Sequence, residues 1–162
     1  MTLLDLCTSL EASSLGTAIS ESEWLFPTIE TVHVLALTLV IGSIAMLDLR
    51  LLGVSSRDRG VVALAAETLP WTWGAFVVAA ISGSLMFVSA ATTYYDNTPF
   101  RIKLVLLALA GLNMAVFHFT AYRRVHHWNE TVPTPIAART AATLSLIFWI
   151  GVVFAGRWIG FV

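Results

Sequence analysis

Charged residues are scarce in this sequence of 162 residues. Asp, Glu, Lys and Arg together make up 12% of the chain, whereas hydrophobic residues make up 57% and the mean hydropathy is +0.82. About a quarter of the residues in a soluble domain are charged. The shortage argues against a soluble domain and indicates an integral membrane protein whose first partner is the lipid bilayer.

Cysteine and net positive charge are lacking as well. The single cysteine, Cys7, cannot form an internal disulfide, and its isolation excludes Cys-rich zinc or iron–sulfur sites. The net charge of −1 argues against nucleic acid as a partner. Residues 1–22 carry Asp5 and Glu11 where a signal peptide has basic residues, and they lack a long apolar core. We therefore expect residues 1–162 to form one membrane domain without a signal peptide.

Long apolar runs dominate the rest of the chain. Four segments, near 28–52, 72–93, 101–123 and 137–161, have the roughly 20 residues that a membrane-spanning helix needs. Their short connections favour an up-down bundle. The leucines of residues 1–22 follow a helical spacing, which predicts a short N-terminal amphipathic helix at the membrane interface. The expected fold is an all-α membrane protein with four transmembrane helices.

Basic residues are distributed unequally between the two sides of the expected bundle. Three lie on the side that holds both termini, namely Arg101, Lys103 and Arg157. The other six lie at or near the first and third connections, namely Arg50, Arg57, Arg59, Arg123, Arg124 and Arg139. Because cytoplasmic loops carry an excess of Lys and Arg, we expect a multi-pass protein of the bacterial inner (cytoplasmic) membrane with both termini periplasmic.

The first apolar segment carries three polar residues on one stripe. Glu30 and Asp48 are eighteen residues apart and share a helix face, with His33 about 60° away. Such a stripe is expected to face protein, a cavity or a cofactor, because lipid does not solvate it. Arg139 and Arg157 share a face of the fourth segment in the same way. Ion pairs Glu30–Arg157 and Asp48–Arg139 that fix the helix register are therefore one interpretation.

Two histidines lie within the expected membrane helices. His33 is either a neutral, hydrogen-bonded core residue or a metal ligand, and the motif Glu30-x-x-His33 lacks the second copy that a di-metal carboxylate centre needs. His118 is expected to differ from His33 in depth by about 15 Å, so the two cannot ligate one iron. Two separate sites remain open, with Met86 and Met46 either as second ligands or as packing residues.

The third segment begins with two cations. Arg101 and Lys103 oppose the helix dipole there, so an anion such as a haem propionate or a lipid phosphate would stabilise them. Snorkelling of both side chains to the headgroups is the alternative. Small residues at positions 75, 79 and 83, and at positions 156 and 160, allow close helix contact. They favour a homo-oligomer.

Three stretches carry a resemblance to a known family. The runs WLFPTIETVHVLALTLVIGSIAMLDLRLLG, PFRIKLVLLALAGLNMAVFH and FAGRWIG resemble an uncharacterised bacterial family of small four-helix inner-membrane proteins. More distantly, the chain is similar to CopD-type copper-resistance membrane proteins and to small b-type cytochromes, in which membrane histidines ligate haem or copper. That similarity implicates His33 and His118. The chain departs from the diheme pattern, which needs four axial histidines at matched depths.

The leading prediction is a protein that binds heme b and serves electron transfer or redox sensing, as a relay rather than a complete enzyme. His33 would be an axial ligand whose ring Glu30 orients, since metal-bound histidines usually have such a partner. His118 would ligate a second haem or metal, and electrons would come from a quinone or a redox partner protein. The propionates would be neutralised by Arg101, Lys103 and Arg157.

Two other functions stay open. In a copper-handling protein or a small-solute permease, Glu30, His33 and Asp48 would line a polar path, with a copper ion as the alternative cofactor. Only four methionines are present, whereas thioether ligands are typical of Cu(I) sites. In a structural membrane subunit, the buried charges would only fix the helix register.

Overall fold

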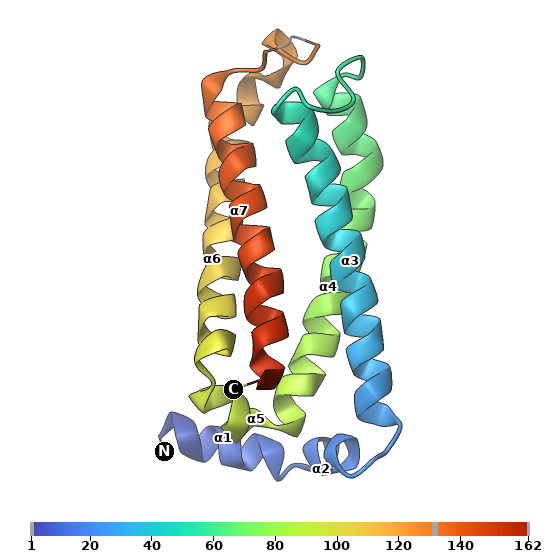
Figure 1. Ribbon diagram of the computed structural model, residues 1–162, viewed down its shortest axis with the longest axis vertical. Helices are drawn as coiled ribbons and strands as arrows, with labels where there is room; N and C mark the ends of the chain where they lie inside the picture. Colours follow the sequence, from blue (N-terminus) through green and yellow to red (C-terminus); the bar gives the residue numbers. More distant parts are fainter. Residues whose placement is uncertain (1, 131–132, 162) are drawn as a thin grey trace.

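Four long helices run up and down along the molecule (Figure 1). The computed structural model describes residues 2–130 and 133–161, and in those residues it contains helices and no strand. The long helices are α3 (Leu25–Leu51), α4 (Val61–Ser89), α6 (Thr98–Phe119) and α7 (Ile136–Trp158). Each is long and apolar enough to cross a membrane. The prediction of an all-α four-helix membrane protein is confirmed.

Short helices cover the two ends of the bundle. At the end that holds both termini, α1 (Leu3–Glu11) and α2 (Ser14–Ser20) lie across the long helices (Figure 1). The connection from α4 to α6 adds α5 (Ala91–Asp96) at this end, and the 3-10 helices are η1 (Tyr122–His127) and η2 (Ile159–Phe161). The expected N-terminal interfacial helix is therefore a pair of helices, with exposed leucines in both.

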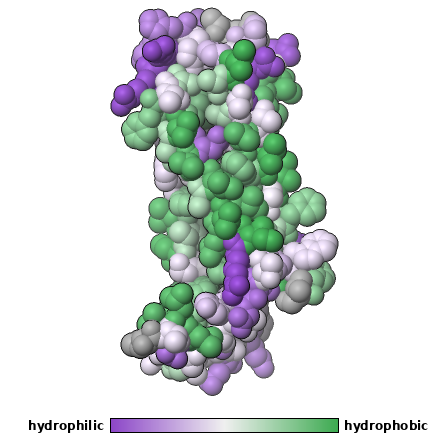
Figure 2. Space-filling model, turned by 90° about the vertical axis from the view of Figure 1, so that its left-hand side faces the viewer, coloured by the Kyte–Doolittle hydropathy of each residue, from purple (hydrophilic) through white to green (hydrophobic). Residues whose placement is uncertain are grey.

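The surface carries a broad apolar belt. Figure 2 shows hydrophobic residues around the middle of the molecule and hydrophilic residues toward its ends, with hydrophilic atoms interrupting the belt in its lower half. Large apolar side chains of α6 such as Val105, Leu112 and Val116 are exposed. This is the surface that a bilayer covers.

The long helices pack as two pairs. Helix α3 lies along α4, helix α6 lies along α7, and contact between α3 and α7 joins the pairs. Among the described residues, α4 and α6 are not a packed pair. The side of the bundle between α4 and α6 is therefore where side chains and cavities, rather than close helix contact, fill the space.

The boundaries of α4 and α6 differ from the predicted ones. Helix α4 begins at Val61 rather than near residue 72, and Pro70 lies inside it. A proline interrupts one backbone hydrogen bond, and membrane helices tolerate this when neighbouring groups compensate. Helix α6 begins at Thr98 and ends at Phe119, after which the chain tightens into η1.

At the end with the α1–α2 pair, Glu11 ties that pair to α5. Its Oε2 accepts hydrogen bonds from the Thr92 backbone N–H at 2.9 Å and from the Thr92 hydroxyl at 2.6 Å. These bonds favour the ionised carboxylate and lower the pKa of Glu11. Gly16 lies so close to α4 that a Cβ there would be 3.0 Å from the Val88 carbonyl oxygen. The end helices thereby hold α5 in place.

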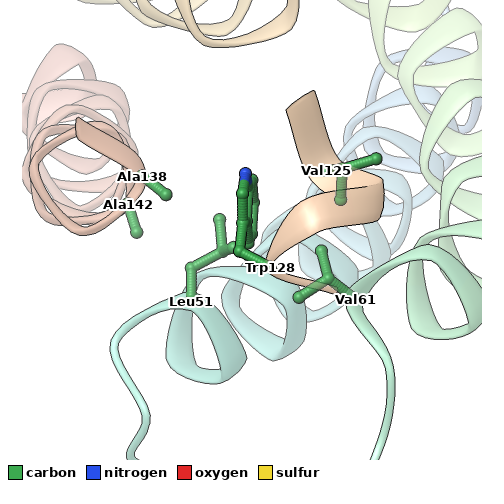
Figure 3. Close-up of a cluster of buried hydrophobic side chains, with 6 residues drawn as sticks. All are labelled: Leu51, Val61, Val125, Trp128, Ala138 and Ala142. Carbon is green, nitrogen blue, oxygen red and sulfur yellow. The ribbon is translucent and has the colours of Figure 1, made fainter. Parts of the chain in front are cut away.

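At the opposite end, a buried apolar cluster closes the bundle (Figure 3). Beside it, Arg50 is fully buried, with 0% exposure. Its Nε donates to the Arg59 carbonyl at 2.6 Å and its Nη2 to the Asn129 carbonyl at 3.3 Å. Arg50 therefore joins the two connections at this end. The cluster consists of Leu51, Val61, Val125, Trp128, Ala138 and Ala142.

Asn129 caps the first turn of α4 from a distant part of the chain. The N-cap residue Gly60 has no side chain to accept a hydrogen bond. Instead, the Asn129 backbone carbonyl accepts from the Val61 N–H at 3.0 Å, and its Oδ1 accepts from the Val62 N–H at 2.8 Å. Two otherwise unpaired donors of the helix end are thus satisfied, which explains why α4 starts well before Pro70.

We predict that Asn129→Ala lowers the free energy of unfolding by about 1 kcal/mol, the typical cost of a lost N-terminal cap. Asn129→Asp is the matched control, since aspartate keeps an acceptor oxygen for the Val62 N–H and suits a helix N-terminus. Denaturant or thermal unfolding of the purified protein in detergent measures both. Equal destabilisation by the two substitutions would contradict the capping role.

Candidate functional site

A cavity of about 650 Å³, here called the His33 cavity, lies between α4 and α6 toward the end that holds the termini. One wall comes from α4 between Ala79 and Val88, and the other from α6 between Phe100 and Leu107. Helix α5 adds two tyrosines. His33, 9% exposed, reaches the cavity from α3. The site thus uses the side of the bundle where α4 and α6 do not pack.

The hydrogen bonds of His33 fix the tautomer of its neutral ring. Nδ1 lies 2.9 Å from the Ala79 carbonyl oxygen and 3.0 Å from the Ser82 hydroxyl oxygen. A carbonyl only accepts, so Nδ1 carries the hydrogen and donates it. The Ser82 hydroxyl donates to the Val78 carbonyl at 2.7 Å and can accept from Nδ1. Nε2 then carries the lone pair, and no hydrogen bond within the described part of the chain reaches it.

Gly83 lets the His33 ring lie against α4. A Cβ at this position would be 3.0 Å from His33 Cε1 and 3.4 Å from Nδ1, closer than nearly all real contacts. Ala75 and Ala79, on the same stripe of α4, are buried. One residue of this small-residue repeat, Gly83, therefore serves a contact inside the protein, with the His33 ring. The homo-oligomer that this repeat favoured stays a prediction.

The structure brings two of the three predicted cations to the cavity. Lys103 is half-buried in its wall and, in residues 2–130 and 133–161, forms neither an ion pair nor a hydrogen bond. Arg101 also lines the cavity, where its Nε donates to the Tyr95 carbonyl at 2.8 Å. Arg157 is exposed, lies 4.7 Å over the Phe161 ring and is not among the residues that line the cavity.

Glu30 does not orient the His33 ring, so that prediction is wrong. Glu30 is exposed. The Nδ1–H group of His33 donates its hydrogen bond to the Ala79 carbonyl of α4 instead. The charge of Glu30 acts instead on Tyr94, a tyrosine of the cavity. Burial first, and Glu30 second, raise the pKa of the Tyr94 phenol, which therefore stays protonated at neutral pH.

The two register-fixing ion pairs do not form. The ion pairs within the described residues are Arg59–Glu67 and Arg101–Asp96. Glu30 and Arg157 are each exposed at the end of the bundle. Asp48 is 6% exposed and lines a cavity, whereas Arg139 is exposed. Helix register is therefore set by packing and hydrogen bonds.

His118 lies far from His33, near the other end of α6. His118 is exposed, and its ring stacks on the ring of Tyr122 with centroids 5.4 Å apart and an interplanar angle of 21°. Neither His118 nor the two candidate second ligands, Met86 and Met46, line a cavity with His33. In the described part of the chain, no three His, Cys, Asp or Glu side chains gather as a metal-binding group.

A second cavity, of about 240 Å³ and here called the Asp48 cavity, lies farther from the end that holds the termini. Asp48 lines it, and Leu107 belongs to the walls of both cavities. The polar stripe of the first segment predicted that Asp48 faces the interior. It gave no signal for the other polar residues of the cavity, which are Ser43, Thr72, Asn113 and Ser145.

These features define a class: a small four-helix integral membrane protein with two largely apolar cavities that each contain a few polar groups. The family model described as "Family of unknown function (DUF6644)" matches residues 10–162, and the chain belongs to this family. No curated protein and no solved structure matches the chain.

We predict that Gly83→Ala lowers the free energy of unfolding by about 1 kcal/mol or more, as expected for overpacking against a fixed ring. The new methyl group displaces His33 from its hydrogen bond to Ala79. Gly74→Ala on the same helix is the control, because a Cβ there meets nothing within 4 Å. Thermal unfolding in detergent compares them. A Gly83→Ala protein as stable as the control would contradict the contact with His33.

Proposed function

We propose that the His33 cavity binds heme b and that the protein serves electron transfer or redox sensing in the membrane. The observation that carries this proposal is the tautomer of His33. With Nδ1–H bonded to the Ala79 carbonyl, the ring has the arrangement that metal-ligating histidines usually have, and Nε2 is the free ligand atom.

Aromatic walls suit a flat, apolar macrocycle. The rings of Phe87 and Phe100 stack with centroids 5.5 Å apart, and the ring centroids of Tyr94 and Phe100 are 5.1 Å apart. All three line the His33 cavity. Such walls exclude water and favour a ligand that is apolar over most of its surface. The aromatic walls therefore support the proposal of a haem, whose macrocycle is flat and apolar.

Cations in the wall suit the carboxylates of the same ligand. Lys103 has no counter-charge within the described residues, and a lone ammonium in the membrane is costly. Arg101 lies on the same wall, in the first turn of α6. A haem propionate would neutralise Lys103, and a second could bind Arg101 in addition to its partner Asp96.

Haem supplies reversible one-electron chemistry at its iron. The chain contributes a ligand at His33, charge compensation at Lys103 and Arg101, and an apolar wall. His33 is the one histidine of this cavity, so we propose a single protein ligand from this chain. A quinone or a partner protein would exchange electrons along the lipid-facing side between α4 and α6, and the protein would act as a relay.

A small-solute permease is the second candidate. The observation in its favour is that two cavities with polar groups in their walls share the lining residue Leu107. In that function, His33 and Asp48 would line one path. A copper-handling role would require soft ligands, and the His33 cavity contains no methionine or cysteine.

We also propose that the protein resides in the bacterial inner membrane with both termini in the periplasm. The support is the excess of arginines at or near the two connections, which lie at the end opposite the termini (Figure 1). We predict that alkaline phosphatase fused to the C-terminus is active, whereas a fluorescent protein that matures only in the cytoplasm is dark there. The reverse pattern would contradict this orientation.

For the haem proposal, we predict that protein purified from haem-supplemented cells shows a Soret band and a reduced α-band. His33→Ala should lose both bands, because it removes the iron ligand. Absorption spectra of air-oxidised and dithionite-reduced samples, with haem and metal analysis on the same samples, make the measurement.

His118→Ala is the matched histidine control and should retain the spectrum if one haem binds at His33. Arg157→Ala should also retain it, whereas Lys103→Ala should lower haem occupancy. Absence of a Soret band in the unmodified protein, with unchanged folding, would remove the haem proposal. Loss of haem in His118→Ala but not in His33→Ala would show that the site is misassigned.

A further inference from the structure

Asp48 is a buried carboxyl with one oxygen left unpaired. It is 6% exposed within α3, and Ser145 of α7 lines the same cavity. Its Oδ2 has no partner among the described residues, although it is buried. An unpaired carboxyl oxygen in a membrane protein carries a large desolvation cost. Because Asp48 lines a cavity, a bound group there can offset that cost.

The other polar groups of the Asp48 cavity present lone pairs rather than hydrogens. The Thr72 hydroxyl donates to the Ser43 oxygen at 2.7 Å or to the Thr68 carbonyl at 3.0 Å. The Ser43 hydroxyl donates to the Val40 carbonyl at 3.0 Å. With these hydrogens directed to protein oxygens, both hydroxyl oxygens keep lone pairs that can face a ligand.

Asn113 follows the same rule. Its Nδ2 donates to the Ala141 carbonyl of α7 at 2.9 Å, so the amide oxygen is the end left without a hydrogen bond in the described structure. Ser145, one helical turn further along α7, adds another hydroxyl group to the cavity wall. The cavity is lined by no Lys, Arg or His. The polar groups of its wall are therefore one carboxyl and several neutral oxygens.

We propose that the Asp48 cavity is a binding site for one small monovalent cation, of which sodium is the natural probe. Hard cations take carboxylate, carbonyl and hydroxyl oxygens as ligands. A single carboxylate balances one positive charge, whereas a divalent ion would keep a net charge inside the membrane. Sodium sites of membrane transporters combine such oxygens near the middle of the bilayer. The proposed ligands are Asp48, Ser43, Thr72 and Asn113.

Sodium-dependent stability tests the site. The full-length protein in detergent is unfolded thermally in increasing NaCl, with choline chloride holding the ionic strength constant. A ligand that binds the folded state raises its stability in a saturable way, so we expect the unfolding temperature to rise with sodium and to level off. Asp48→Asn, of nearly the same shape, should abolish this sodium response.

Equilibrium dialysis with radioactive sodium gives the second readout, and we expect one ion per chain. Ser43→Ala removes one neutral oxygen and should weaken sodium binding roughly tenfold, the size expected for one lost ligand interaction of about 1.4 kcal/mol. This variant keeps the proposal testable if Asp48→Asn does not fold. When both proteins are prepared without haem, His33→Ala, in the other cavity, should bind sodium like the unmodified protein, whichever way the haem experiment turns out.

Three results would overturn the proposal. The first is an unmodified protein that responds equally to sodium and choline and binds no radioactive sodium, which would leave Asp48 a protonated or water-bound carboxyl. The second is an Asp48→Asn protein that keeps the full sodium response. The third is stabilisation by calcium chloride, but not by sodium chloride, at matched ionic strength.

Discussion

Inside a bilayer, a polar side chain has to find its partner within the protein, and this constraint decides where the polar groups of the long helices lie. Most hydroxyls meet it locally, as Ser82 does by donating to the carbonyl four residues earlier. His33 Nδ1 meets it across helices, at the Ala79 carbonyl. Some of the exceptions are then informative. Nε2 of His33, the ammonium of Lys103 and Oδ2 of Asp48 lack partners in the described structure, and each residue lines a cavity.

The cavities exist because the bundle is built from two tight pairs of helices. Small residues of α4 let α3 approach closely, and Gly83 even accommodates an imidazole ring. Between α4 and α6 there is no such packing. The ends are tied by hydrogen bonds, since Glu11 binds α5 at one end and Arg50 links the two connections at the other. The His33 cavity lies on the side where α4 and α6 do not pack.

Apolar runs predicted the four helices because length and hydropathy suffice for that. The start of α4 was missed, since Asn129 caps it from a part of the chain 68 residues beyond Val61. The polar stripe on the first segment correctly predicted that His33 and Asp48 lie in the interior. The i, i+3 spacing of Glu30 and His33 was misleading, because the acceptor for the His33 ring is a carbonyl of α4. Spacing within a helix reports shared faces, whereas partners on other helices depend on packing. Hydroxyls in apolar helices give little signal, as their own backbone usually satisfies them.

The two cavities have opposite electrostatic character although they share Leu107. The His33 cavity is lined by the cations Arg101 and Lys103, whereas the Asp48 cavity is lined by one carboxylate and by neutral oxygens. Charge is weakly screened in the low-dielectric interior. If both proposals hold, a cation at Asp48 and an anionic ligand at His33 stabilise one another, and linkage requires the effect to be equal in both directions. One bundle would then combine a redox site and an ion site whose occupancies are coupled by charge alone, with no movement of the helices.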